Sequence, residues 1–67
     1  MDRTYLRKVN QAAHLYRQFR CNYITEESLG DQLAWIVEEV QDMASIEGAH
    51  MAHDRDAAIA CINGMAA

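Results

Sequence analysis

Apolar residues recur every three or four positions along the first part of the chain, which is the period of an amphipathic α-helix. One stripe contains Leu6, Val9, Ala13, Tyr16 and Tyr23, and it is widened by Tyr5, Ala12, Leu15 and Phe19. The opposite half of the same cylinder is polar and contains Arg3, Arg7, Asn10, Gln11, His14, Arg17 and Gln18. This pattern predicts a helix over about residues 3–21, with one face in a core and the other facing solvent.

A second helical pattern follows a predicted turn at residues 22–25. Thr25 is a suitable N-cap, and the acidic Glu26 and Glu27 come next, where the positive end of the helix dipole favours carboxylates. Apolar residues then repeat at intervals of four and three, as in a heptad seam, at Leu29, Leu33, Ile36, Val40 and Met43. We expect Gly48 to end this helix or to bend it.

A shorter third helix is predicted over about residues 53–63. Ala58, Ile59, Ile62 and Met65 form its apolar face, and Gly64 is a natural stop. No segment alternates between apolar and polar residues as a strand would. The expected fold is therefore all-α: residues 1–67 form one domain, an antiparallel hairpin of two longer helices with a shorter third helix.

Composition limits the classes of protein that are possible. The 67 residues are 51% hydrophobic, which argues against a disordered chain, and no apolar run is long enough for a membrane span. No export signal is visible at the start, and there are only two cysteines, Cys21 and Cys61. We therefore expect a cytoplasmic protein whose two thiols are reduced, and small buried core positions are the favoured interpretation of both cysteines.

The net charge of −4 conceals a strong asymmetry along the chain. Five basic side chains against Asp2 give residues 1–24 a net charge of +4, whereas residues 25–47 carry −7 and residues 48–67 carry −1. The favoured interpretation is that the two longer helices neutralise each other within the hairpin. Arg17 and Arg20 would then lie near Glu26, Glu27 and Asp31, and Arg3 and Arg7 near Glu38, Asp42 or Glu47.

Either charged helix could instead face a partner. Arg3, Arg7 and Arg17 lie near one line opposite the apolar stripe, as in a helix that binds nucleic acid. The acidic composition and the lack of a DNA-reading motif argue against this alternative. The seven carboxylates of residues 25–47 could in turn mimic a phosphate backbone, although acidic solvent-facing helices are common.

Trp35 does not belong to the apolar seam of its helix, because it points about 100° away from Ile36. The third helix could cover it together with Ile46, and packing alone slightly favours this arrangement. The alternative is an interface, because tryptophan is enriched at binding hot spots with polar surroundings. Glu38, Glu39 and Asp42 would supply those surroundings. A chain this short also commonly gains stability by oligomerisation, so a homodimer is a further possibility.

Catalytic motifs are lacking. Glu47 and His50 have the Glu-x-x-His spacing of carboxylate-bridged metal sites, but the first helix offers no facing carboxylates beyond Asp2. No base is arranged near a serine, and no glycine-rich loop could hold a phosphate. We therefore expect neither an enzyme nor a bound cofactor or metal.

These observations favour a small protein-interaction module that occupies a surface of a larger partner. Size and charge resemble those of regulators and inhibitors that phages and mobile elements direct at host nucleic-acid-binding or defence proteins. The expected contact residues are Trp35, Glu38, Glu39 and Asp42. The alternatives are a dimeric DNA-binding regulator that uses Arg3, Arg7 and Arg17, and a helical metal-binding protein that uses Glu47 and His50.

Overall fold

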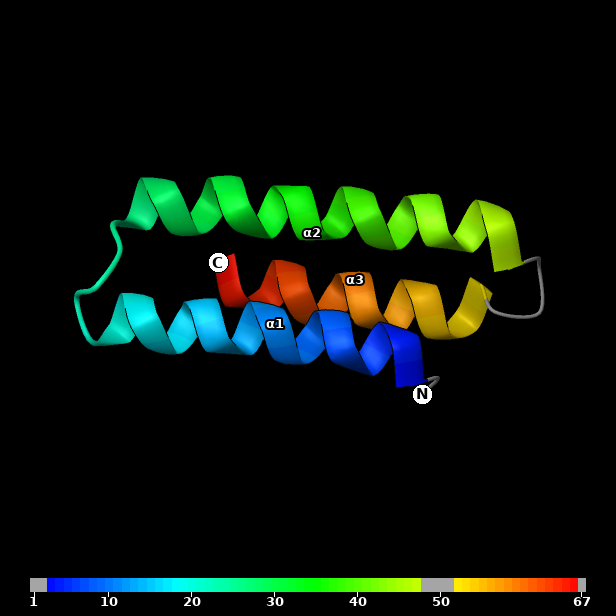
Figure 1. Ribbon diagram of the computed structural model, residues 1–67, viewed down its shortest axis with the longest axis horizontal. Coiled ribbons are helices and arrows are strands. Elements are labelled where there is room, and N and C mark those ends of the chain that lie inside the picture. Colours follow the sequence, from blue (N-terminus) through cyan, green and yellow to red (C-terminus); the bar gives the residue numbers. More distant parts are fainter. Residues whose placement is uncertain (1–2, 48–51, 67) are drawn as a thin grey trace.

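The computed structural model describes the backbone of residues 3–47 and 52–66 and the side chains of residues 3–42 and 53–65. The residues described form three helices: α1 (Arg3–Arg20), α2 (Glu26–Glu47) and α3 (Ala52–Ala66) (Figure 1). The described residues contain no strand. The predicted all-α architecture is therefore confirmed.

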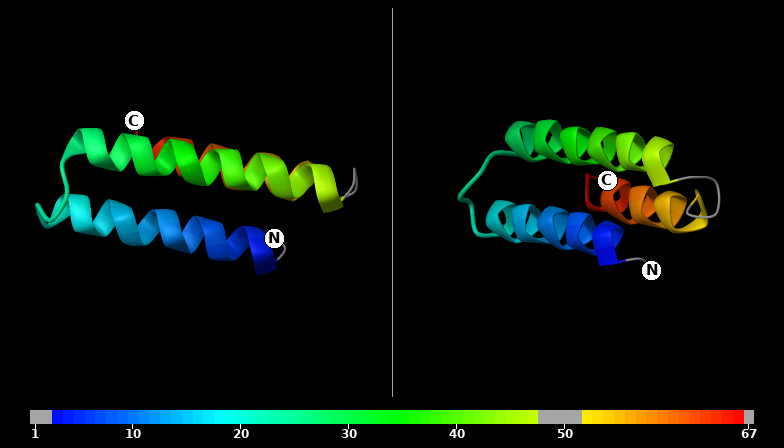
Figure 2. Two further views of the ribbon diagram at one scale, coloured as in Figure 1. Left: turned by 45° about the horizontal axis from the view of Figure 1, so that its top comes forward. Right: turned by 45° about the vertical axis from the view of Figure 1, so that its right-hand side comes forward.

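The helices form an elongated three-helix bundle measuring 38 × 17 × 16 Å. α1 and α2 are antiparallel, and α3 lies along both of them, so that every pair of helices is in contact (Figures 1 and 2). Because α3 is the shortest helix, its C-terminal end stops well before the connection between α1 and α2 (Figure 1). No helix in the described part of the chain is both long enough and apolar enough to cross a bilayer.

The core draws on all three helices. Its buried side chains are Tyr5, Ala12, Leu29, Leu33, Ile36, Val40, Ala58 and Ile62. The predicted seam of α2 is confirmed from Leu29 to Val40, whereas the side chain of Met43 lies outside the described residues. Burial of such a shared apolar face stabilises each helix, since an isolated helix of this length is marginal in water.

The apolar face of α1 is rotated relative to the prediction. Tyr5 and Ala12 are fully buried, whereas Leu6 is 45% exposed and Tyr23 is 79% exposed. The reason is that α1 packs against two neighbours, and the direction that faces both lies along the Tyr5–Ala12 row. Tyr23 follows the end of the helix, so the helical period no longer determines where its side chain points.

The connection between α1 and α2 is shaped by Asn22. Its φ of 65° places it in the left-handed region, which asparagine tolerates better than most residues. The Tyr23 amide donates to the Gln18 carbonyl (2.9 Å) and the Asn22 amide donates to the Phe19 carbonyl (3.0 Å). These two bonds form a Schellman motif, which satisfies the last carbonyls of α1 and reverses the chain.

Thr25 is the N-cap of α2, as predicted. Its Oγ1 accepts a hydrogen bond of 3.1 Å from the backbone amide of Ser28, three residues into the helix. This bond satisfies one of the amides that have no partner in the first turn of a helix.

The Thr25→Ala substitution should therefore lower the free energy of unfolding by about 1 kcal/mol, because the Ser28 amide loses its acceptor. Urea unfolding followed by circular dichroism measures this loss. Thr25→Ser is the matched control, since serine keeps the acceptor oxygen and should stay close to the parent protein. Equal losses in both variants would contradict the assigned cap.

The glycines affect the helix ends differently from the prediction. α3 continues through Gly64 to Ala66, so the predicted stop at Gly64 is wrong. The following residue, Met65, is half-buried and packs against the core, and this contact favours a continued helix over the glycine's weak preference for a stop. α2 ends at Glu47, directly before Gly48, which itself lies outside the described residues.

Candidate interaction surface

Trp35 is exposed on the outer side of α2. Its side chain is 67% accessible to solvent, although it is among the largest apolar groups of the chain. The prediction that the third helix would cover it is therefore wrong, because α3 packs against the seam of α2 and Trp35 points away from that seam. The side chain of Ile46, expected beside it, lies outside the described residues.

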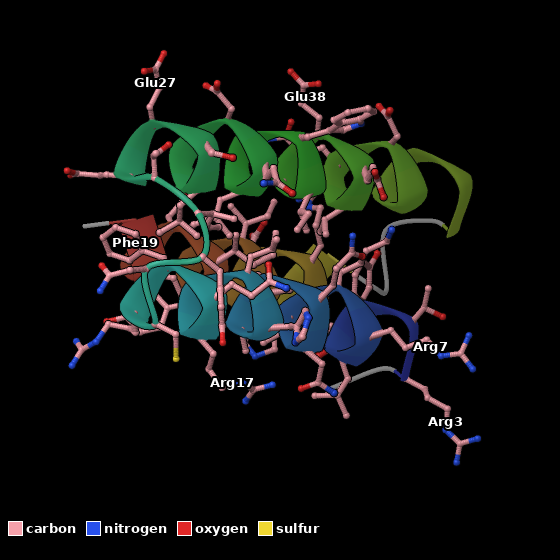
Figure 3. The ribbon with its side chains drawn as sticks, turned by 60° about the vertical axis from the view of Figure 1, so that its left-hand side comes forward. Arg3, Arg7, Arg17, Phe19, Glu27 and Glu38 are labelled. Atoms are coloured by element: carbon pink, nitrogen blue, oxygen red, sulfur yellow. The ribbon has the colours of Figure 1, made fainter. Side chains whose placement is uncertain are left out.

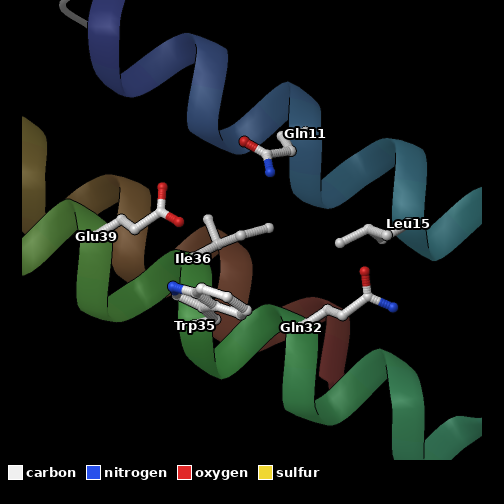
Figure 4. Close-up of a pocket in the computed structure, with 6 residues that line it drawn as sticks. All are labelled: Gln11, Leu15, Gln32, Trp35, Ile36 and Glu39. Carbon is white, nitrogen blue, oxygen red and sulfur yellow. The ribbon is translucent and has the colours of Figure 1, made fainter.

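A shallow groove of about 250 Å³ runs between α1 and α2 beside this tryptophan. α1 contributes Gln11 and Leu15, and α2 contributes Gln32, Trp35, Ile36 and Glu39 (Figure 4). Ile36 is buried and Leu15 half-buried, so they form an apolar floor. Two amides and one carboxylate stand around it. The groove therefore combines apolar area with hydrogen-bonding groups, as ligand-binding surfaces do.

One ion pair crosses between the two helices at the edge of this groove. The Lys8 ammonium group donates to the Glu39 carboxylate, and both side chains are partly shielded from solvent. A pair of this kind is worth at most about 1 kcal/mol, but it holds α1 and α2 in a defined register. The Glu39 carboxylate is therefore already paired with the Lys8 ammonium group, and it is less available to a partner than the prediction assumed.

Helical spacing places three other carboxylates near Trp35. Asp31 lies four residues before Trp35, Glu38 three residues after it and Asp42 seven residues after it, which places all three on neighbouring rows of α2. All three are exposed. Trp35, Glu38 and Asp42 thus lie on one accessible stretch of α2. Asp31 belongs to the same stretch, although it was not among the predicted contact residues.

The arginines of α1 lie away from this acidic stretch. Figure 3 shows Glu27 and Glu38 pointing outward from α2, and Arg3, Arg7 and Arg17 extending from α1 on the opposite side of the molecule. Arg3, Arg7 and Arg17 are exposed, and none of them forms an ion pair among the described residues.

The predicted neutralisation within the hairpin is therefore wrong for most of these charges. Among the described side chains, no arginine of α1 pairs with Glu26, Glu27, Asp31 or Glu38. Arg20 instead donates to the Tyr16 hydroxyl at 3.4 Å, with its guanidinium 6.0 Å from the centre of that ring. Apart from Lys8 and Glu39, most charged residues of α1 and α2 are exposed on the outer faces of the two helices, because the faces that meet are occupied by the core.

The two cysteines are free thiols, but both are exposed, so their predicted core positions are wrong. Within the described residues, no group of three histidine, cysteine or acidic side chains could hold a metal ion. The proposed Glu-x-x-His pair is not tested, because His50 and the side chain of Glu47 lie outside the described residues.

Sequence reasoning missed the α1 side of the groove. Gln11 and Leu15 were assigned to opposite halves of their helix, yet both line the same depression. Their four-residue spacing was a usable signal, since residues four apart are neighbours on a helix surface.

No family model, curated protein or solved structure matches this chain.

Proposed function

We propose that this chain is a small protein-interaction module that acts by occupying a surface of a larger partner, as a regulator or inhibitor. The observation that carries the proposal is the 67% exposure of Trp35 beside a groove between two helices. An exposed tryptophan leaves a large apolar area in contact with water, and burial of that area would stabilise the protein. A partner that covers it would recover that free energy as affinity, and tryptophan is enriched among hot spots for this reason.

The surroundings of Trp35 favour a partner with a basic surface. Asp31, Glu38 and Asp42 are exposed on the same stretch of α2. Carboxylates around an apolar anchor attract positive patches and repel negative ones, so they select the partner and speed its approach. Nucleic-acid-binding proteins carry such patches, which is why an inhibitor of a host nucleic-acid-binding or defence protein is our preferred form of this function.

Comparative affinity capture tests this function. The parent chain, Trp35→Ala and Tyr23→Ala are immobilised, and lysate of the organism that carries the gene is passed over each. Tyr23 is the matched control, because it is an aromatic residue that is 79% exposed but does not line the groove. A protein retained by the parent and by Tyr23→Ala but lost with Trp35→Ala supports the proposal. Retention that is the same on all three chains contradicts it.

The arginines of α1 favour duplex DNA binding as a second candidate function. Arg3, Arg7 and Arg17 are exposed, lie on one helix and extend away from the acidic side of the molecule (Figure 3). This arrangement would let them approach phosphates while the carboxylates stay distant. The overall charge of −4 opposes such binding, and for that reason the candidate ranks second.

DNA binding by these arginines has a measurable salt dependence. Each phosphate contact contributes a slope of about −0.9 to the logarithm of the binding constant against the logarithm of salt concentration. Replacing Arg3, Arg7 and Arg17 together with glutamine should therefore reduce the size of that slope by about 2.7. Fluorescence anisotropy of a labelled duplex measures it. If the parent chain does not bind the duplex at low salt, this second function is wrong.

A further inference from the structure

We infer that the outer face of α1, together with Tyr23, binds a single strand of nucleic acid. The arginines of α1 hold its phosphates, and the Tyr23 ring stacks on an unpaired base. The inference goes beyond both functions proposed above, because its surface is not the Trp35 groove and its ligand is not duplex DNA. It is carried by the position of Tyr23 beside Arg17, the lack of acidic residues in α1 and the separation of this face from the acidic side of the molecule.

Tyr23 and Arg17 line the same shallow depression, of about 160 Å³, at the C-terminal end of α1. The Tyr23 side chain is 79% exposed, so a ligand can cover its ring without any movement of the helices. The Tyr23 amide donates to the Gln18 carbonyl at 2.9 Å, which ties the backbone of this residue to the end of α1. An aromatic ring and a guanidinium group therefore border one accessible site. The residues that line it are His14, Arg17, Gln18, Cys21 and Tyr23.

An aromatic ring beside a cation suits a single strand better than a duplex. An unpaired base offers a flat face that stacks on an aromatic side chain, and the neighbouring phosphate accepts hydrogen bonds from arginine. In a duplex the bases are stacked on one another inside the helix, so the Tyr23 ring would reach no base face. Only phosphate contacts would remain, and the exposed ring would contribute nothing to binding.

α1 continues the cationic surface away from Tyr23. Arg3, Arg7 and Arg17 extend on the same side of the molecule (Figure 3), and α1 contains no acidic residue. Arg3 and Arg17 are about 21 Å apart along the helix axis, a length that suits a strand of several nucleotides. Tyr23 also borders a second depression, which Glu26 lines. The strand is therefore expected to run from Tyr23 toward Arg3 and not onto α2.

The acidic side of the molecule lies far enough away to act weakly on this surface. Glu27 and Glu38 point outward from α2 on the opposite side (Figure 3), and the bundle measures 17 × 16 Å across. Charges in solvent are largely screened beyond about 8 Å at physiological salt. The overall charge of −4 therefore opposes binding to α1 less than its size suggests.

Fluorescence anisotropy at low salt provides the test, with labelled oligothymidylate, labelled oligouridylate and a labelled DNA duplex of equal length as probes. We expect the parent chain to bind a single strand more tightly than the duplex, and the tighter of the two strands identifies the ligand as DNA or RNA. Tyr23→Ala should bind that strand about tenfold more weakly, because it loses one stacked base. Tyr23→Phe keeps the ring and should stay within about twofold of the parent.

Trp35→Ala is the matched control, because it removes an exposed aromatic side chain that does not line the Tyr23 depression. We expect this variant to bind the strand within about twofold of the parent. The salt dependence separates the two kinds of contact. Arg17→Gln should reduce the size of the salt slope by about 0.7, whereas Tyr23→Ala should weaken binding and leave the slope unchanged, since stacking releases no counterions.

The outcomes that overturn this inference differ from those that contradict the functions proposed above. Tighter binding of the duplex, full binding by Tyr23→Ala or equal losses in Tyr23→Ala and Trp35→Ala would each show that the single-strand site is wrong. Duplex binding by the parent would still support the second candidate function in all three cases. Sedimentation with phosphatidylserine vesicles that Leu6→Ala abolishes, without binding of either strand, would assign this face to a lipid surface and overturn the inference. The Trp35-dependent function is decided separately, by the captured protein.

Discussion

Replacing Leu33 with alanine is expected to unfold most of the protein at room temperature. Leu33 is 2% exposed and belongs to the core shared by the three helices. Removing a buried leucine side chain costs about 2.7–5 kcal/mol, because the lost apolar contacts leave a cavity. The core of a domain this small supplies only roughly 3–5 kcal/mol in total. Helical content measured by circular dichroism should therefore fall strongly in this variant.

Leu6→Ala is the control for this prediction, because it makes the same chemical change at a site that is 45% exposed on α1. Half-exposed sites lose less apolar burial, so we expect a cost below about 1 kcal/mol and a fully folded variant. The sequence pattern alone placed Leu6 in the core, so this pair of variants also tests the rotation of α1. Similar losses for Leu6 and Leu33 would contradict the packing described above.

Replacing Trp35 with alanine should leave the fold intact and weaken binding of the partner. Surface changes away from caps and buried networks usually alter the free energy of unfolding by less than about 0.5 kcal/mol, and we expect Trp35→Ala to fall in that range. Binding of the captured partner should weaken by at least about 2 kcal/mol, or about 30-fold, as for a hot-spot residue. Urea unfolding and a binding isotherm on the same samples measure both quantities.

Tyr23→Ala again controls for the loss of an exposed aromatic side chain, and it should leave both quantities near those of the parent. If Trp35→Ala instead lost helical content to the extent expected of Leu33→Ala, Trp35 would be a core residue. If both aromatic variants weakened partner binding equally, the contact would not be specific to the groove.

The sequence predicted best those features that depend on one helix alone. The seam of α2 from Leu29 to Val40 and the Thr25 cap are both where the pattern placed them. Each is determined by spacing or by a neighbouring residue, so no knowledge of the other helices was needed.

Features that depend on how helices meet were not predicted correctly. Leu6 and Cys61 are apolar residues on helices, yet both are accessible, because burial depends on which direction faces two neighbours at once. Gly64 did not stop α3, since a core contact by Met65 outweighed the local preference. The charges of α1 and α2 could have paired, but packing of the apolar faces directed most of them outward.

The candidate interaction surface was only partly predictable for the same reason. The direction of Trp35 relative to Ile36 followed from helical geometry and was sufficient to identify an unusual residue. Whether α3 would cover it depended on the path of the chain after α2, which the pattern did not determine. The contribution of Gln11 likewise required the position of α1 beside α2.

Acrylamide quenching of Trp35 fluorescence is the most direct test of the claim that this residue is an accessible contact for a partner. Acrylamide is uncharged, so the carboxylates around Trp35 do not repel it. We predict that the folded chain alone is quenched nearly as efficiently as the urea-unfolded chain, and that bound partner protects the indole. Weak quenching in the folded chain alone, or quenching that partner does not change, would contradict the account.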